Sequence, residues 1–467
     1  MAQHRQFGKR SESHPGQGEL FDEAEAEMGS EADTAEEPEV ETISYTRNKP
    51  KRKPLPAELP REQVILDIPD EEKVCDCCTG PLHQIGQDSA ERLEFIPAQL
   101  KVIETIRPKY ACRHCEQQGE MVPIKQALPA KNVVPKGIAT PSLLSQIVTS
   151  KYQYGLPLYR QESMFKQYGI ELSRQTMSAW MLRCAEALQP LYEQLRQTLL
   201  AQSVLQADET TLNVINEDKS TCYMWLYCSG ADSPQKHGPP NIVLYDYQRS
   251  RSGQCPVDFL DGFSGYLQVD GYAGYEQTQA TLVGCWAHAR RKFMEAKKSQ
   301  PKGKSGKADM ALSYIQKLYA LESSLKGKST VEKYTQRQQQ AKAQLASFRD
   351  WLEKSVRNTP PKSHLGQAVH YSLNQWDKLV RYLEDGRLSI DNNRAERAIK
   401  PFVIGRKNWL FSNTPAGAQS SAILYSLVET AKTNGLVPYD YLTLLFTQLP
   451  QHEQKDDLTH LLPWNIK

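Results

Sequence analysis

Three acidic residues, Asp208, Asp270 and Glu396, are placed where they could share a pair of metal ions. Asp208 ends the apolar run SVLQAD, Asp270 ends GYLQVD, and Glu396 lies in IDNNRAERAIKP, which has the pattern of a helix. Two Mg²⁺ ions about 3.5–4 Å apart can activate an oxygen nucleophile and stabilise a leaving oxygen at a phosphodiester, and they require hard oxygen ligands. We therefore expect the centre of a polynucleotidyl transferase, with two catalytic Mg²⁺ ions held by these three carboxylates.

Each of these acids also has an ordinary structural interpretation. An aspartate at a strand end is more often a turn residue or a helix cap, and Glu396 could simply pair with Lys400 one helical turn later. The hypothesis therefore depends on all three acids occurring in this order. The basic residues near Glu396 that we expect to contact DNA are Arg394, Arg397, Lys400, Arg406 and Lys407.

The segment CWAHARRKF follows the second aspartate and contains Cys285 and His288, three positions apart, a spacing compatible with metal binding. The ordinary interpretation of such a pair is the packed beginning of a helix. A second role stays open, in which the pair supports the carboxylates or positions a DNA strand. The basic residues that follow are further candidates for DNA contact: Arg290, Arg291 and Lys292.

Two CxxC pairs indicate a metal site in a chain that shows no secretory signal at its N-terminus. With 33 residues between the pairs, a zinc ribbon with an inserted hairpin fits better than a compact knuckle, and EFIPAQLKVIETIRPKYAC reads as alternating strands. Cys77 is spare, and His83 or His114 could replace a thiolate. The role is structural, because four protein ligands leave no open position. The expected ligands of this single Zn²⁺ are Cys75, Cys78, Cys112 and Cys115.

Residues 138–200 have helical patterns separated by glycine-containing turns. A short helix, a turn and a second helix that begins SRQTMSAWM, with Ser173 as its N-cap, are typical of a helix-turn-helix. A plain helical bundle is the alternative. In the DNA-binding interpretation, the residues at the start of the second helix that reach base edges are Arg174, Gln175 and Ser178.

Residues 203–299 contain five apolar or alternating runs, SVLQAD, CYMWLYCS, NIVLYDY, GYLQVD and TLVGCW. Helical sequence follows the third run and the fifth. Three strands joined by short turns, a helix and two further strands are the order of an RNase H-like sheet, which would place Asp208 and Asp270 side by side. Long helical patterns over 308–385 indicate an all-helical insertion before Glu396.

The chain as a whole has the composition of a globular protein, with 39% hydrophobic and 24% charged residues in 467. No apolar run approaches the ~18 residues of a membrane span, so we expect a cytoplasmic protein without a membrane partner. The net charge of +2 hides an acidic tract at 19–41, with eleven acidic and no basic residues. The KPKRK run that follows is either a solvated linker or an arm that contacts phosphates.

These patterns predict a multidomain α/β protein. The N-terminal segment is too polar to offset the entropy of ordering. In chain order, the expected parts are a disordered segment at 1–60, a zinc ribbon at 61–130, a helix-turn-helix domain at 135–200, the first part of an RNase H-like core at 201–300, a helical insertion at 301–386, the rest of the core at 387–435 and a helical tail at 436–467.

QADETTLNV, VDGYAGYE, GCWAHARRKF, DNNRAERAIKPFVIGRKNWLFS and AILYSLVETAKTNGL resemble the transposase of the insertion sequence 66 (IS66) family, a bacterial DDE transposase. The CxxC pairs, LPLYRQE and LSRQTMSAW resemble that family's zinc-binding and helix-turn-helix portions, so the resemblance runs from about Gln6 to the C-terminus. It implies that Asp208, Asp270 and Glu396 are the DDE triad. It also implies that Cys285 and His288 match the Cys-x2-His signature found after the second Asp in several such transposases.

The partners that the resemblance implies are the element's terminal inverted repeats and target DNA, together with small accessory proteins of the same element; we also expect a homo-oligomer on DNA. Two features depart from the family pattern. Members usually begin with a leucine-zipper-like helix ahead of a segment resembling RQFGKRSE, with which this chain almost starts. Many DDE enzymes have a basic residue two turns after the Glu, where this chain has Val403, so Lys400 or Arg397 would contact the DNA instead.

Three functions follow from these patterns. The first is Mg²⁺-dependent cleavage at the inverted repeats with strand transfer into target DNA. The second is a catalytically inactive DNA-binding regulator derived from a transposase. The third is a related structure-specific nuclease, which would cut branched DNA without joining it.

Overall fold

The computed structural model describes residues 100–111, 124–219, 221–231, 238–300, 306–452 and 457–466. The chain divides into two compact units, Ala35–Gln126 and a larger one that comprises Met1–Thr34 and Ala127–Lys467. In the described part of the smaller unit, β1 (Lys109–Tyr110) pairs antiparallel with β2 (Lys125–Gln126). Of the alternating strands expected over EFIPAQLKVIETIRPKYAC, the described residues contain β1 alone. The four expected zinc ligands lie outside the described residues.

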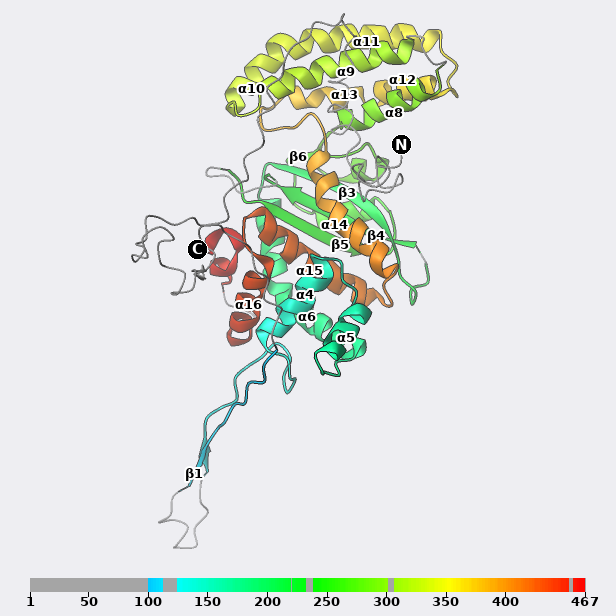
Figure 1. Cartoon of the computed structure of the whole chain (residues 1–467). Helices are drawn as coiled ribbons and strands as arrows, with labels where there is room; N and C mark the ends of the chain where they lie inside the picture. The colour runs from blue at the N-terminus through cyan, green and yellow to red at the C-terminus, as the bar shows by residue number, and fades with distance from the viewer. Residues whose placement is uncertain are drawn as a thin grey trace, which may run out of the picture. The chain divides into compact units, whose positions relative to one another are not determined.

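A five-stranded mixed sheet forms the centre of the larger unit (Figure 1). Its spatial order is β5-β4-β3-β6-β7, with β3, β4 and β5 antiparallel and β6 and β7 parallel to β3. All five strands expected from the sequence are present. Their bounds are β3 (Val204–Asn213), β4 (Thr221–Ser229), β5 (Ile242–Gln248), β6 (Tyr266–Gln268) and β7 (Thr281–Val283).

The first strand is longer than its apolar run suggested. It continues five residues beyond Asp208, and its pairing with β4 extends to Asn213 opposite Thr221. The expectation that Asp208 ends a strand is therefore wrong, because cross-strand pairing carries the polar segment ETTLN into the sheet. Asp270, in contrast, does lie two residues beyond the end of β6.

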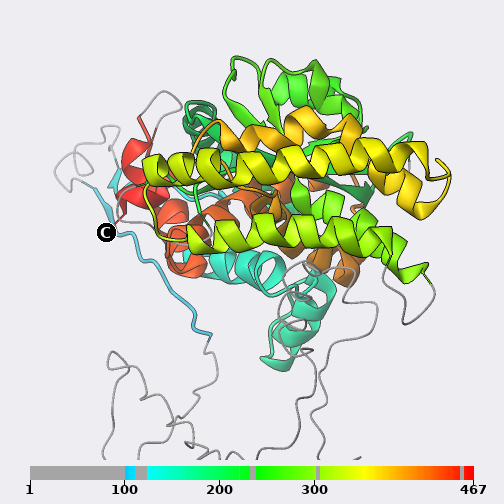
Figure 2. The ribbon, with the colours of Figure 1, turned by 90° about the horizontal axis from the view of Figure 1, so that it is seen from above.

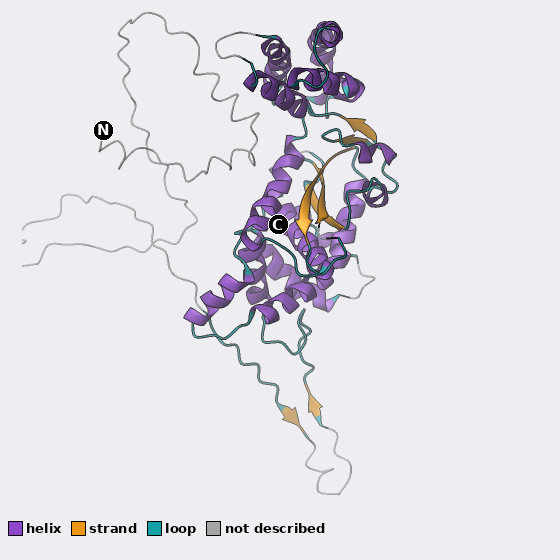
Figure 3. Ribbon diagram, turned by 90° about the vertical axis from the view of Figure 1, so that its right-hand side faces the viewer, coloured by secondary structure: helices purple, strands orange, loops and turns teal. Residues whose placement is uncertain are grey.

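Helices cover both faces of the sheet, which explains why β4 and β5 read as nearly continuous apolar runs. On one face, Tyr245 of β5 contacts Phe402 and Tyr425, and on the other, Tyr227 of β4 stacks on Phe259. Figure 3 shows the strands between the two groups of helices. The first face carries α14 (Asn393–Trp409) and α15 (Pro415–Thr433), and the second carries α7 (Gln254–Phe259) and the 3₁₀ turn η4 (Ala273–Gln277).

Hydroxyl groups of α15 also cover the open edge of β5. The backbone N–H of Val243 donates to Thr430 Oγ1 at 3.1 Å, and that of Tyr245 donates to Ser426 Oγ at 2.8 Å. An exposed strand edge would otherwise offer these groups to another chain. The edge is thus closed by side chains of a helix that lies about 180 positions further along the sequence.

Four further helices pack together beside α15: α4 (Pro141–Tyr152), α5 (Leu158–Gln167), α6 (Arg174–Leu200) and α16 (Pro438–Gln448). Of these, α4, α6 and α16 contact α15, and α5 contacts α4 and α6. Ser173 caps α6 as expected, since its side chain accepts from Thr176 N at 3.2 Å. Gly435 follows α15 with φ of +79°, the left-handed conformation of a helix stop.

A second core lies in the helices between β7 and α14, which Figure 2 shows from above. Trp286, Phe293, Phe348 and Trp376 pack together at its centre. The helices are α8 (Trp286–Lys298), α9 (Lys307–Ser324), α10 (Thr330–Gln336), α11 (Lys342–Arg357), α12 (His364–Asn374) and α13 (Trp376–Val380), and a π-helical turn at Arg337–Ala341 links α10 to α11. No helix in the described ranges combines the length and apolarity needed to cross a membrane.

Candidate active site

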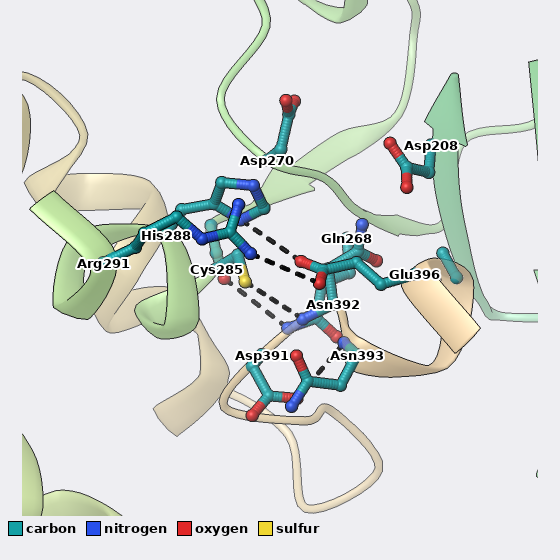
Figure 4. Close-up of polar contacts among 12 residues, drawn as sticks. Asp208, Gln268, Asp270, Cys285, His288, Arg291, Asp391, Asn392, Asn393 and Glu396 are labelled. Atoms are coloured by element: carbon teal, nitrogen blue, oxygen red, sulfur yellow. Dashed lines mark hydrogen bonds and ion pairs between the residues drawn. The ribbon is translucent and has the colours of Figure 1, made fainter. Parts of the chain in front are cut away.

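Three elements bring the three predicted carboxylates together (Figure 4). In the parallel pair of β3 and β6, Gln206 lies opposite Gln268. Asp208, still within β3, and Asp270, just beyond the end of β6, each follow these glutamines by two positions. Glu396 lies in the first turn of α14, which packs on β3. The convergence follows from strand register and from helix packing, and no local pattern could impose it.

Asp208 is in an environment that disfavours its charge. Burial raises its pKa well above the ordinary value, and Glu209, Asp270 and Glu396 raise it further by repulsion between like charges. A single backbone bond opposes this, from Glu209 N to Asp208 Oδ1 at 2.8 Å. A carboxylate held in this way is stabilised by a cation placed among the acids.

Glu209 is adjacent in sequence but points to the other face of the sheet. Asp208 lies opposite Leu226 of β4, whereas Glu209 lies opposite Trp225, and successive residues of a strand alternate. Glu209 accepts from Tyr275 Oη at 2.7 Å and pairs with Arg251. Its charge therefore has partners of its own, and we do not count it among the candidate metal ligands.

A tight turn fixes Asp270. Its Oδ1 accepts from Tyr272 N at 2.9 Å, and its backbone carbonyl accepts from Tyr371 Oη at 2.7 Å. Gly271 between them has φ of +101°, and a Cβ there would lie 3.1 Å from Tyr371 Oη. The glycine of the VDGY motif is thus required by the turn that presents the second carboxylate.

Two side chains of α8 face Glu396. His288 Nδ1 lies 3.5 Å from Glu396 Oε1, and Arg291 Nη2 lies 3.7 Å from Oε2. Burial lowers the pKa of His288 to about 4, with Arg291 and Lys292 contributing, although Asp270 opposes the shift. His288 is therefore neutral at neutral pH. Of the two α8 side chains, Arg291 is the one whose positive charge balances Glu396.

Cys285 is wholly buried beside this group. Its sulfur accepts from the backbone N–H of Asn392 at 3.2 Å, and burial raises its pKa well above the ordinary value. The candidate ligand atoms of Cys285, His288 and Glu396 all lie within 4.8 Å of one another. The Cys-x2-His pair singled out in the sequence thus adjoins the third carboxylate and belongs to the same site.

The donor set suits a hard divalent cation. Asp208, Asp270 and Glu396 offer carboxylate oxygens, the ligands that Mg²⁺ prefers, and the mutual repulsion that raises the pKa of Asp208 would be relieved by positive charge. By ligand chemistry the three carboxylates suit the expected ions, whereas the group of described residues whose candidate ligand atoms all lie within 4.8 Å of one another is Cys285, His288 and Glu396. A softer ion would find its ligands at Cys285 and His288 instead.

Two of the basic residues expected to contact DNA are buried. Arg290 is 8% exposed and Arg394 is 6% exposed. The guanidinium of Arg394 donates to Ser229 O through Nε at 3.2 Å and Nη2 at 2.6 Å. The expectation is wrong for these two, because each lies on the face of its helix that packs inward, a direction that a run of basic residues in sequence does not reveal.

The other basic candidates stay accessible to different degrees. Arg406 is half-buried and donates to Thr210 Oγ1 at 3.2 Å, near the end of β3. Trp409, at the end of the same helix, contacts Tyr152 and Tyr425 and is partly buried against the core. Arg291 and Lys407 are exposed, and the partly exposed candidates are Lys292, Arg397 and Lys400.

The three candidates on α6 are exposed in its first two turns. Arg174, Gln175 and Ser178 all lie on the solvent side, whereas Met177 and Trp180 point into the core. The backbone N–H of Arg174 donates to Glu162 Oε1 at 3.1 Å, which ties α5 to the start of α6. This geometry leaves the three side chains able to reach a ligand outside the protein.

The sequence analysis missed the polar residues that surround the triad. Gln206, Gln268 and Tyr371 are all buried or half-buried around the carboxylates. A signal for two of them was present, since both aspartates are preceded by glutamine two positions earlier, in LQAD and LQVD.

Four family models match successive parts of the chain. The model described as the transposase IS66 family matches residues 136–420. The zinc-finger binding domain of transposase IS66 matches residues 72–116, and the IS66 C-terminal element matches residues 426–464. Residues 1–64 match a model described as transposase C of IS166 homeodomain.

Curated relatives are similar over most of the chain. The uncharacterized protein y4qI of Sinorhizobium fredii (strain NBRC 101917 / NGR234) is 35% identical over 439 residues, which are 90% of this chain and 79% of the relative. The uncharacterized protein y4jD of the same strain is 34% identical over 427 residues, 88% of this chain and 81% of the relative. No solved structure matches the chain.

Proposed function

Because the chain belongs to the IS66 transposase family, we propose that it is a DDE-type DNA transposase with an RNase H-like core. In this proposal it cleaves DNA at the terminal inverted repeats of an insertion sequence and joins the released ends to target DNA. Asp208, Asp270 and Glu396 form its catalytic triad. The relatives are uncharacterized, so the argument for the chemistry comes from this chain's own residues.

The observation that carries the proposal is the convergence of three carboxylates from the central strand, the end of its parallel neighbour and a helix across the sheet. The sheet supports the same interpretation. Three antiparallel strands followed by two parallel ones, with the first strand in the centre, are the arrangement of an RNase H-like sheet. Such a sheet presents acids of its first and fourth strands together, which is where Asp208 and Asp270 lie.

In the proposed mechanism, two Mg²⁺ ions, when bound, lower the pKa of the attacking water and neutralise charge that develops on the phosphate. The three carboxylates would hold these ions in place. Arg291 and the neutral His288 contact the two oxygens of Glu396 from α8 and restrict its orientation. Tyr371 and the Gly271 turn restrict Asp270, so positioning supplies much of the catalysis.

The reaction proceeds in two steps of the same kind. First, water attacks a phosphorus at the element end; the P–O bond to the 3′ oxygen breaks, and that oxygen leaves as a 3′-OH. Second, this 3′-OH attacks a phosphorus of target DNA in line, and the target's own 3′ oxygen leaves. Each step exchanges one P–O bond for another, so no oxidant or energy source is required.

Other parts of the chain bind the substrate in this proposal. The unit matched by the zinc-finger model would hold one structural Zn²⁺ through Cys75, Cys78, Cys112 and Cys115. The start of α6 would read the terminal repeats in a helix-turn-helix arrangement. Assembly as a homo-oligomer on DNA, with small accessory proteins of the element, completes the proposal. The side chains assigned to DNA are Arg174, Gln175, Ser178, Arg291, Lys292, Arg397, Lys400, Arg406 and Lys407.

The decisive test is cleavage of inverted-repeat DNA with Mg²⁺ by the wild type and by Asp208→Asn. The variant should lose cleavage and strand transfer by at least about 10³-fold and keep its affinity for the DNA ends. Asp246→Asn is the matched control, because Asp246 is a buried aspartate of the same sheet, on β5, and should leave activity intact. Strand transfer by Asp208→Asn would refute the triad, and end binding without any cleavage by the wild type would favour a DNA-binding regulator.

A further inference from the structure

A matched pair of glutamines lies directly before the two catalytic aspartates. Gln206 and Gln268 precede Asp208 and Asp270 by two positions, and they face each other across the parallel pair of β3 and β6. Both are buried, at 8% and 0% exposure. Residues two apart on a strand point to the same face, so Gln206 and Asp208 are neighbours on one face of β3, and Gln206 is the more buried of the two.

The two amides form a chain of hydrogen bonds. Gln206 Nε2 donates to Gln268 Oε1 at 3.3 Å, and Gln206 Oε1 accepts from the backbone N–H of Ala395 at 3.3 Å. Gln268 Nε2 donates to Ser389 O at 2.7 Å. Ser389 and Ala395 stand at the two ends of the segment that leads into α14, immediately before Glu396, so the pair binds this segment at both ends.

Asn392 secures the middle of the same segment. Its Nδ2 donates to Ala207 O at 2.9 Å, on the strand between Gln206 and Asp208, and its backbone N–H donates to Cys285 Sγ. The segment 389–395 therefore contacts β3, β6 and the start of α8 through buried groups. Glu396 follows at once, with no intervening residue that could absorb a shift.

Glutamine suits this position for a physical reason. The bridge needs a donor and an acceptor on each side chain, which a neutral amide supplies and an apolar side chain does not. A glutamate would place another negative charge beside Asp208, whose charge is already disfavoured by its neighbours. An apolar residue would leave Ala395 N–H or Ser389 O buried without a partner.

We propose that Gln206 and Gln268 are positioning residues that set the separation of Glu396 from the two aspartates and so tune metal affinity at the active site. The inference rests on the proposed function, since it gives the pair a purpose in metal binding. Simple core filling is the alternative. It predicts a loss of stability alone, whereas the proposal predicts a change in metal requirement as well.

The experiment compares Gln206→Met, Gln268→Met and the double variant with the wild type in the full-length protein. Gln161→Met is the matched control, because Gln161 is also fully buried and donates to two backbone carbonyls, Ile147 O and Leu156 O, but in α5. Two quantities are measured. One is amide hydrogen exchange over residues 389–396, and the other is the Mn²⁺ concentration that gives half-maximal cleavage of inverted-repeat DNA.

Both glutamine variants should exchange faster over 389–396 and need about tenfold more Mn²⁺, the usual cost of losing a group that orients a metal ligand. The double variant should cost little more than either single one, because the amides act as one bridge. Gln161→Met should lower the melting temperature without changing either quantity.

Three results would overturn the inference or its premise separately. Unchanged exchange over 389–396 in both variants would show that the pair does not hold the segment. Faster exchange with an unchanged Mn²⁺ midpoint would show that the pair fills the core and does not tune the site. If Asp208→Asn cleaved the DNA as well as the wild type does, the proposed function would be rejected. In that case, faster exchange over 389–396 in both glutamine variants would still show that the bridge holds this segment.

Discussion

At the scale of single residues, the charge of Asp208 is the clearest feature of the site. Its pKa is raised above the usual value by burial and by three nearby carboxylates. A group of this kind stabilises the metal-free fold below the pKa it has in the unfolded chain, and that contribution is lost as pH rises through its folded pKa. At neutral pH, the metal-free protein therefore carries a penalty, which a cation bound among the acids would relieve.

We expect Asp208→Asn to raise the melting temperature of the metal-free protein at pH 7.5, by an amount that corresponds to about 1 kcal/mol. The variant should also lose the stabilisation that Mg²⁺ gives the wild type. Asp246→Asn serves as the comparison, because burial raises the pKa of Asp246 to about 6: it should be stabilised too, yet keep its response to Mg²⁺. Thermal unfolding with and without Mg²⁺ measures both effects, and an undiminished Mg²⁺ response in Asp208→Asn would contradict the assignment.

His288 gives the site a dependence on pH with the opposite sign. Its pKa of about 4 lies below the ordinary 6.5, so the unfolded chain takes up a proton at a higher pH than the fold does. The stabilisation is complete above about pH 6.5 and is lost as pH falls towards 4, with a total of about 3 kcal/mol. His288→Gln should remove this slope. Melting temperatures at several pH values between 4 and 7 test it, and parallel curves for the two proteins would count against a neutral, buried His288.

At the scale of elements, Arg337 connects the helices between β7 and α14 to the segment that leads into α14. Its side chain is 2% exposed, pairs with Glu322 at 2.7 Å and donates to the carbonyls of Tyr382, Asp385 and Leu388. The π-helical turn that begins at Arg337 interrupts the regular helix at this residue. This arginine thus connects the helical layer to the chain that continues into α14.

Arg337→Met should lower the free energy of unfolding by about 3–5 kcal/mol, since it leaves Glu322 and three carbonyls without their buried partner. Arg349→Met is the control: Arg349 pairs with Glu353 on the surface, with both side chains about half exposed, and its loss should cost less than about 1 kcal/mol. Urea denaturation of both variants provides the comparison. Equal losses would mean that Arg337 is not an anchor.

In the proposed function, the start of α6 contacts DNA. Arg174→Ala and Gln175→Ala together should reduce the preference for terminal-repeat DNA over random duplex by about tenfold, and leave the Mg²⁺ requirement of cleavage unchanged. Arg183→Ala on the same helix is the control, since Arg183 is exposed and pairs with Glu186. Competition binding at fixed salt gives the ratio. An unaltered preference would favour a plain helical bundle.

At the scale of the whole molecule, the chain joins a zinc-binding unit to a nuclease-like core in the proposed assembly. The family model for the zinc finger covers residues 72–116. Cys75→Ser should reduce the zinc content from about one ion per chain towards zero, whereas Cys255→Ser, a buried cysteine of α7, should leave it unchanged. Elemental analysis of the purified proteins decides the matter, and equal zinc in the Cys75 variant would argue against the ribbon.

Several features could be predicted because each depends on a short stretch of sequence. The five strands of the sheet, the helices that follow the third and fifth strands, the N-cap at Ser173 and the stop at Gly435 each depend on neighbouring residues alone. The family follows from motifs of the same kind. The three acids could be chosen for the same reason, since each stands beside a recognisable run.

The tertiary structure was needed for the features that depend on the direction of a side chain and on its contacts with residues distant in sequence. Gln206 contacts Ala395, 189 positions away, and Gln268 lies 62 positions from Gln206. Arg394 points into the core, while Lys407, on the same helix, faces solvent. Local periodicity carries no information about such encounters, because they are set by strand register and by the packing of helices on the sheet. Sequence alone therefore named the acids, and packing revealed the residues that hold them in place.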